Sequence, residues 1–246
     1  PENFELSDQI AHANLCGFGK SVIQAVLEGK VEQLVLVNCC DSMRRVYDIV
    51  ESTGKCKFLY MLDMPHEDND CEKVKLAQGI HRLKKAYEKF SGKTFDRSGF
   101  LNAFSHETVD NQPYIGVLGV RVSGILEKMI RDNIRMDVEN LTCTGGRRLA
   151  VIREELEKME DDAMFLAYAD ALLSQMPCFR MNNSTRRNRL YLDPNLKGII
   201  YHTIKFCDYY GFEYASIKRD IKVPLLKIET DFTSQSAGQL LTRVQA

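Results

Sequence analysis

The chain has 246 residues, enough for one large or two modest domains, and 44% of them are hydrophobic, enough to bury a core without covalent cross-links. Its 33 basic and 34 acidic residues give a net charge of −1, so the composition does not favour binding to nucleic acid or to an anionic membrane. The sequence contains no signal-peptide pattern and no apolar run near the ~20 residues of a membrane span, and we expect a cytoplasmic location. Because it begins at Pro1 rather than Met, we interpret it as a fragment or a processed chain.

Helix-like and strand-like segments alternate through the first half of the sequence. Apolar residues at helical spacing predict helices, whereas short continuous apolar runs predict buried strands. The expected elements are a helix at 18–30 closed by Gly29, a strand at 31–37, a helix at 42–53 with Ser42 as its N-cap, a strand at 57–62 and a charged helix at 70–90.

The second half repeats this plan. The expected elements are a strand at 114–122, a helix at 125–133, a strand within 134–141, helices near 150–174 and 184–190, a strand at 197–204, a turn and helix at 205–221, a strand at 223–231 and a final helix at 236–245. The alternation is typical of α/β domains with mostly parallel sheets. A break at 107–113 predicts a domain boundary, with an N-terminal α/β domain at 1–110, expected to be truncated, and a C-terminal α/β domain at 111–246.

Eight cysteines are the unusual feature of the composition, and they stand at positions 16, 39, 40, 56, 71, 143, 178 and 207. They show no CxxC spacing and are too sparse for a disulfide framework, which disfavours a zinc ribbon, a thioredoxin-like site or a disulfide-stapled fold. In a reducing compartment, such thiols are buried small hydrophobes or ligands of a soft metal. For any single cysteine, packing in the core is the better interpretation.

The collective placement of six cysteines favours the metal-ligand interpretation. Ligands of open α/β sheets bind outside the carboxyl ends of the strands, and helix N-termini stabilise thiolates. The six that fall at turns are Cys16, Cys39, Cys40, Cys143, Cys178 and Cys207. Cys56 instead precedes a strand, and Cys71 stands in the first turn of the charged helix.

Other motifs carry less information. The five histidines have no HxxxH-type spacing, and we expect surface or capping roles for His66 and His202. No Walker-type GxxxxGK[ST] is present, so ATP binding of that kind is not expected. The aromatic residues of "CDYYGFEY", 207–214, are interpreted as core packing rather than as a substrate-binding wall.

Seven segments, in order along nearly the whole chain, resemble one protein family. They are "LCGFGKS" at 15–21, "NCCDSMRRVYD" at 38–48, "YIGVLGVRVSG" at 114–124, "DVENLTCTGGRR" at 137–148, "MPCFRMNNSTRRNRL" at 176–190, "GIIYHTIKFCDYYGFEY" at 198–214 and the C-terminal "VPLLKIETDFTSQSAGQLLTRVQA" at 223–246. This order is similar to that of the 2-hydroxyacyl-CoA dehydratase D-component family, which includes benzoyl-CoA reductase subunits and double-cubane cluster proteins. The sequence before the first cysteine segment and the connection around 98–113 are both shorter than is usual in that family.

The resemblance implies two flavodoxin-like (Rossmann-like) domains with an iron–sulfur cluster in the cleft between them. In the dehydratases, three cysteines hold a [4Fe–4S] cluster, and the motifs assign these to Cys16, Cys40 and Cys207. Cys39 is then a neighbour or an additional ligand. In double-cubane relatives, six cysteines hold an [8Fe–9S] cluster, and Cys143 and Cys178 would complete that set. The two interpretations are close, and these two additional cysteines slightly favour the double cubane.

The resemblance also implies low-potential one-electron chemistry. An ATP-dependent activator protein would supply the electron, a homo- or heterodimer with a related subunit is expected, and the substrate class is an acyl-CoA thioester, such as a 2-hydroxyacyl-CoA. The chain is then a reductase or dehydratase subunit. Arg147, Arg148, Arg186, Arg187 and Arg189 are candidates to hold CoA phosphates, although solvated helix arginines are the simpler interpretation. A non-catalytic electron-transfer or scaffold subunit and a metal-free flavodoxin-like domain remain alternatives.

Overall fold

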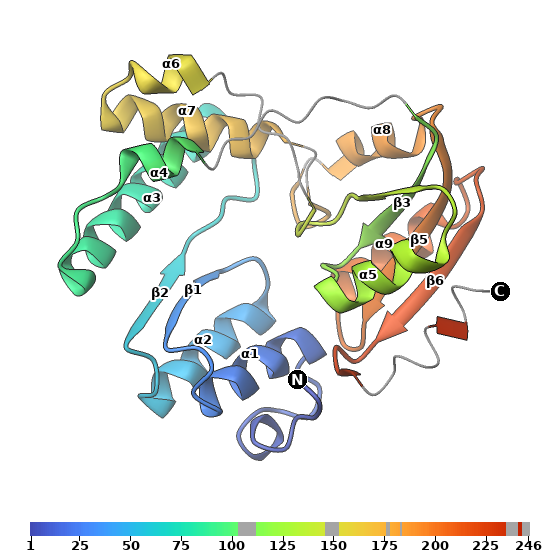
Figure 1. Cartoon of the computed structure of the whole chain (residues 1–246), viewed down its shortest axis with the longest axis horizontal. Coiled ribbons are helices and arrows are strands. Elements are labelled where there is room, and N and C mark those ends of the chain that lie inside the picture. The colour runs from blue at the N-terminus through green and yellow to red at the C-terminus, as the bar shows by residue number, and fades with distance from the viewer. Residues whose placement is uncertain (103–111, 146–152, 176–177, 183, 235–240, 243–246) are drawn as a thin grey trace. The chain divides into compact units, whose positions relative to one another are not determined.

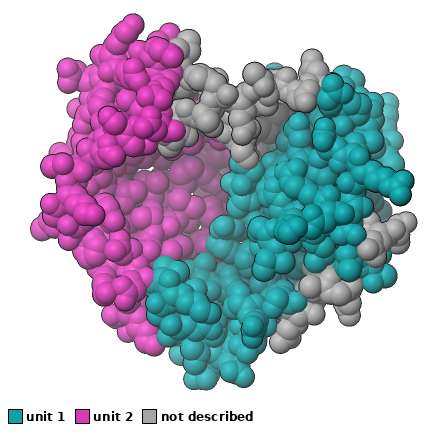
Figure 2. Space-filling model, in the orientation of Figure 1, with its two compact units in different colours: residues 1–31, 110–147, 187–246 teal, residues 32–109, 148–186 magenta. Residues whose placement is uncertain are grey.

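The computed structural model describes residues 1–102, 112–145, 153–175, 178–182, 184–234 and 241–242 (Figure 1). The chain divides into two compact units, each assembled from segments that lie far apart in the sequence (Figure 2). Unit 1 comprises Pro1–Val31, Asp110–Arg147 and Arg187–Ala246, and unit 2 comprises Glu32–Val109 and Arg148–Arg186. None of the helices within the described ranges is both long and apolar enough to cross a membrane.

Unit 1 is built on a four-stranded sheet with the order β4-β3-β5-β6, in which every strand pair is parallel. The strands are β3 (Tyr114–Gly119), β4 (Asp137–Asn140), β5 (Leu196–Ile204) and β6 (Leu225–Thr230). The helices are η1 (Ser7–Gln9), α1 (Gly17–Leu27), α5 (Gly124–Asn133), α8 (Asn188–Tyr191) and α9 (Asp208–Ile217). β5 lies inside the sheet and is buried along nearly all of its length, as expected of a strand covered on both faces.

Helices α5 and α9 cover opposite faces of this sheet. Ile200 of β5 belongs to the buried cluster that contains Leu126 and Ile130 of α5. The next residue, Tyr201, points to the other face, where its hydroxyl donates a hydrogen bond to Glu213 of α9. Successive residues of β5 therefore pack against helices on the two opposite faces of the sheet.

Unit 2 contains a parallel pair of strands, β1 (Gln33–Val37) and β2 (Phe58–Leu62), with α2 (Asp41–Thr53) between them in the sequence. Its other helices are α3 (Asp70–Ser91), α4 (Arg97–Asn102), α6 (Arg153–Glu157) and α7 (Asp161–Ser174). Helix α3 begins where the Asn69 side chain accepts the Glu72 N–H, and it ends at Gly92 in a left-handed conformation.

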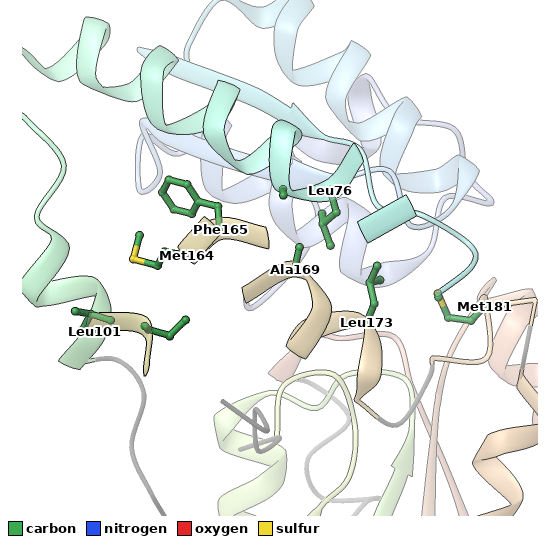
Figure 3. Close-up of a cluster of buried hydrophobic side chains, with 9 residues drawn as sticks. Leu76, Leu101, Met164, Phe165, Ala169, Leu173 and Met181 are labelled. Carbon is green, nitrogen blue, oxygen red and sulfur yellow. The ribbon is translucent and has the colours of Figure 1, made fainter. Parts of the chain in front are cut away.

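A cluster of buried hydrophobic residues in unit 2 lies between its helices. Leu76 of α3 packs with Ala169 and Leu173 of α7, and Leu101 of α4 and Met181 extend the cluster (Figure 3). Because α7 carries apolar residues around much of its circumference, it can contact α3, α4 and α6 at once.

Most of the expected elements are confirmed, and so is the α/β class with parallel sheets. One cap is wrong: Cys40, not Ser42, takes the N-cap position of α2, with extended backbone, so Ser42 lies inside the first turn. The helix expected at 236–245 falls almost entirely outside the described residues. The division into domains at residue 110 stays a prediction about independent folding, whereas the compact units reflect packing within the folded chain.

Candidate functional site

Two of the predicted ligand cysteines lie at the carboxyl edge of the unit 1 sheet. Cys207 follows the end of β5 and is the N-cap of α9, while Cys16 is the N-cap of α1. Helix α1 reaches this edge through Gly17, where an added Cβ would lie 1.8 Å from the carbonyl oxygen of Asp231, the residue after β6. Only glycine allows this approach, which brings Cys16 to the edge where Cys207 also lies.

Cys143 lies in the loop after β4, at the same edge. The loop is tied to the turn after β3, because the Thr144 hydroxyl donates to the carbonyl oxygen of Val122 over 3.3 Å. Thr142 is buried, and its hydroxyl lies 2.7 Å from Asn140 Oδ1. Cys143 is itself exposed between these two threonines. The thiol therefore sits on a fixed loop but remains open to solvent.

A buried histidine holds the middle of this edge together. His202, 1% exposed near the end of β5, has its Nδ1 3.1 Å from the carbonyl oxygen of Arg121 and its Nε2 2.9 Å from the Thr230 hydroxyl. Nδ1–H must donate to the carbonyl, so Nε2 accepts from Thr230 in the neutral tautomer. Burial lowers the pKa of His202 to about 4. The expected surface or capping role for His202 is wrong, because its position in a covered strand places it in the core.

Arg121 follows β3 at this edge and has an unusual environment. Its guanidinium lies 4.0 Å from the centroid of the Phe18 ring in α1, and that ring packs edge-to-face on Phe232. Its Nε is buried and makes no hydrogen bond, the one such side-chain atom within the described residues. No carboxylate in the described part of the chain forms an ion pair with Arg121, so its charge is not paired with any described side chain.

The loops after β5 and β6 each hold a phenylalanine in the left-handed region. Phe206, directly before Cys207, has φ of 65°, and Phe232, directly after Asp231, has φ of 69°. Bulky residues rarely adopt this conformation, which costs on the order of 1–2 kcal/mol. Backbone strain of this kind clusters at ligand sites, which agrees with a functional role for this edge.

A buried ion pair anchors the helix that begins at Cys207. Arg187, 3% exposed, donates from Nε to the carboxylate of Glu213, which also accepts the hydroxyls of Tyr201 and Tyr191. Burial, followed by the charge of Glu213, raises the pKa of Tyr201. Both interpretations of Arg187 from the sequence are wrong, because it is neither solvated nor available to bind phosphate.

The aromatic residues around Cys207 divide between core and surface. Tyr210 is buried, and Tyr214 packs on Tyr201 with ring centroids 5.5 Å apart, as core packing predicts. Phe212 is instead 72% exposed, because it faces away from the sheet on α9.

The carboxyl edge of the unit 2 sheet carries the adjacent cysteines. Asn38 links the ends of the two strands: its Nδ2 donates to Asp63 Oδ1, and its Oδ1 accepts the Met64 N–H, each over 2.7 Å. Cys39 and Cys40 follow directly, and Cys40 opens α2. The prediction that these two thiols follow the carboxyl end of β1 is therefore confirmed.

The environment of Cys40 favours its thiolate. A hydrogen bond from the Cys39 thiol lowers the pKa of Cys40 to about 6. The backbone N–H groups of Met43 and Ser42 at the start of α2 lower it further, although the Cys40 side chain does not form a side-chain cap hydrogen bond of normal geometry. The same pairing, together with burial, raises the pKa of Cys39. One thiolate and one thiol therefore share this helix start.

The segment from Cys178 to Asn182 docks on the loop that follows β2. The Nη1 of Arg180 donates to the Pro65 carbonyl, His66 Nδ1 bonds the Arg180 carbonyl, and Asn182 N–H donates to the His66 carbonyl, at 2.9, 3.0 and 2.8 Å. Docking brings Cys178 and Arg180 close enough to the adjacent pair to influence the Cys39 thiol electrostatically. His66 therefore links this segment to the loop after β2.

Arg186, one of the arginines considered for binding CoA phosphates, forms an ion pair with Asp68, so its charge is already matched. Cys56 precedes β2, at the opposite end of the strand from a carboxyl edge, and Cys71 is exposed in the first turn of α3, as the sequence predicts. Arg147 and Arg148 fall outside the described residues.

The residues at both edges fit an iron–sulfur cluster by their chemistry. The donors are soft thiols at helix N-termini, one with a lowered pKa, and the unit 1 edge holds a cation whose Nε has no partner. Within the described ranges, no three His, Cys, Asp or Glu side chains are arranged to hold a metal ion. Of the six turn cysteines, Cys16, Cys143 and Cys207 belong to unit 1, and Cys39, Cys40 and Cys178 belong to unit 2.

Comparison with known proteins identifies the family. The sequence model of "2-hydroxyglutaryl-CoA dehydratase, D-component" matches residues 1–112 and 105–246, which together span the whole chain. The chain belongs to this family. A curated relative is "Putative dehydratase subunit YjiM" from Escherichia coli (strain K12), which is 27% identical over 150 residues. The aligned region covers 57% of this chain and 38% of that relative.

Proposed function

We propose that this member of the dehydratase D-component family is an iron–sulfur subunit that binds a double-cubane [8Fe–9S] cluster through Cys16, Cys39, Cys40, Cys143, Cys178 and Cys207. The observation that carries the proposal is the docking of the segment that begins at Cys178 on the loop after β2, which brings Cys178 within electrostatic range of Cys39. A single [4Fe–4S] cluster on Cys16, Cys40 and Cys207 provides no reason for a docked segment to bring a third thiol to that edge.

Each residue group has a definite task in this proposal. Helix N-termini at Cys16, Cys40 and Cys207 stabilise thiolates, and buried contacts such as that of His202 hold the sheet edge in place. A bound cluster of this type supplies one-electron reduction at low potential. By family, the electron comes from a cytoplasmic ATP-dependent activator, a related subunit forms the dimer, and an acyl-CoA thioester is the substrate class.

The single [4Fe–4S] cluster is the second candidate. It is favoured by one observation, the exposure of Cys143, since buried thiolates hold a cluster away from solvent more effectively. The same chain could then act as a dehydratase subunit or as a non-catalytic electron carrier.

Anaerobic reconstitution with iron and sulfide tests these readings. We expect about eight irons per chain for the double cubane and about four for the single cluster, with an EPR signal after reduction. Cys178→Ser and Cys143→Ser should lower the iron content if the double cubane is present, whereas Cys56→Ser, the matched control, should not. A folded wild-type chain that stays colourless would exclude both candidates, and unchanged iron in Cys40→Ala and Cys207→Ala would remove the ligand assignment.

A further inference from the structure

The unit 1 sheet edge contains a guanidinium, that of Arg121, which forms no ion pair with any described residue. Several other arginines in the described residues do form ion pairs, as Arg97 does with Asp161 and Arg131 with Glu127. Exposed arginines without a partner, such as Arg135, can be satisfied by water. The Nε of Arg121 is buried away from water and has no hydrogen-bond acceptor, so neither an ion pair nor solvent satisfies it.

The position of Arg121 is set by buried contacts. Its carbonyl oxygen accepts from His202, which is bonded in turn to Thr230 of β6. The guanidinium then lies on the ring of Phe18 at 4.0 Å. A cation–π contact of this kind recovers about 0.5–2 kcal/mol, while a buried donor without an acceptor costs about 1–3 kcal/mol. Because these two contributions are similar in size and opposite in sign, fixing Arg121 in this position adds little to the stability of the fold.

The start of α1, on which the Arg121 guanidinium packs, holds a group that can carry a negative charge. Arg121 lies on the ring of Phe18 in the first turn of α1, and Cys16, two residues earlier, is the N-cap of that helix. A guanidinium on an aromatic platform presents its N–H edge to an anion, and thiolate and sulfide sulfurs accept such hydrogen bonds.

We propose that Arg121 is a positioning residue that donates hydrogen bonds and positive charge to the iron–sulfur cluster held by Cys16, and that it raises the reduction potential of that cluster. The inference rests on the proposed function. A fixed cation favours the reduced, more negative state, so its loss lowers the potential.

The test measures the midpoint potential by EPR-monitored titration of anaerobically reconstituted chain. For Arg121→Gln we expect at least tenfold less reduced cluster at a fixed solution potential, which corresponds to about 59 mV for one electron. Arg121→Lys should fall between Arg121→Gln and the wild type, because it keeps the charge but not the planar fork. Arg135→Gln, which removes an exposed charge from the same unit, should match the wild type.

A second measurement separates this role from a purely structural one. In the cluster-free chain, Arg121→Met should melt no lower than the wild type, because it removes a buried N–H without an acceptor. A lower melting midpoint together with an unchanged potential in Arg121→Gln would assign Arg121 to the fold and overturn the inference. Equal potentials in Arg121→Gln and Arg135→Gln, with wild-type iron content, overturn it while leaving the proposed function intact. A wild-type chain that binds no iron removes the proposed function and this inference together.

Discussion

The carboxyl edges of the two sheets each carry three of the six turn cysteines, but different kinds of contact fix the two edges in place. In unit 1, the edge is fixed by buried contacts: Gly17 packed on the Asp231 carbonyl, and His202 bonded across three strands. In unit 2, the edge depends on polar links at the surface, such as the Asn38–Asp63 pair and the docked segment around Arg180. Buried contacts resist solvent, whereas exposed ones compete with it, so the two edges should respond differently to mutation and pH.

The largest expected effect concerns the ion pair beneath Cys207. Glu213→Ala leaves Arg187 buried without its partner, and we expect a loss of about 3–5 kcal/mol in the free energy of unfolding, measured with urea. Glu229→Ala is the matched control, because Glu229 pairs with Lys227 at the surface and should cost less than about 1 kcal/mol. Similar losses of unfolding free energy in Glu213→Ala and Glu229→Ala would contradict the distinction between a buried and an exposed ion pair.

The second prediction concerns acid. His202 has a folded pKa of about 4, and its unfolded pKa is about 6.5, so the unfolded state binds the extra proton between these values. The stabilisation is complete above pH 6.5 and is lost as the pH falls from 6.5 toward 4, by up to about 3 kcal/mol. In His202→Gln, the free energy of unfolding should be lower at neutral pH, and its slope across this window should be reduced. A slope equal to that of the wild type would show that other groups cause the acid sensitivity.

The third prediction concerns thiol reactivity at the unit 2 edge. In the metal-free chain at pH 7, Cys40 should react with iodoacetamide at least about tenfold faster than Cys56, because the pKa of Cys40 is lowered and burial raises that of Cys56. Mass spectrometry of tryptic peptides can follow both rates, and Cys39→Ala should slow the modification of Cys40 because alanine removes the thiol donor. If Cys40 and Cys56 of the unmodified sequence react at the same rate, the thiolate assignment is wrong.

The smallest expected effect concerns the link between the two strands of unit 2. Asn38→Ala removes two hydrogen bonds that are open to solvent, and we expect a loss of about 1 kcal/mol in stability. Hydrogen exchange at Met64 should increase, since its amide loses its acceptor. A loss as large as that of Glu213→Ala would show that this edge is as rigid as that of unit 1.

The sequence alone determined the elements and much of the site. β5 could be predicted because a buried strand needs an uninterrupted apolar run. The apolar run of β1 also predicted a strand, with Cys39 and Cys40 directly after it, but the expectation that β1 is buried is wrong, because only Leu36 of this strand is buried. The N-cap of α2 was misplaced by two residues, because the preference for serine at that position outweighed the start set by the strand end.

The tertiary structure decided what depends on residues distant in the chain. The contacts of Gly17 with Asp231, of Arg121 with Phe18 and of Arg187 with Glu213 join segments that no local pattern relates. In the sequence, a charged residue within an apolar run, such as Arg121 or Glu213, indicates that the charged side chain is buried. It does not indicate which distant residue contacts that side chain. Local propensities act over a few residues, whereas burial and charge pairing are settled only when the sheet brings its carboxyl ends together.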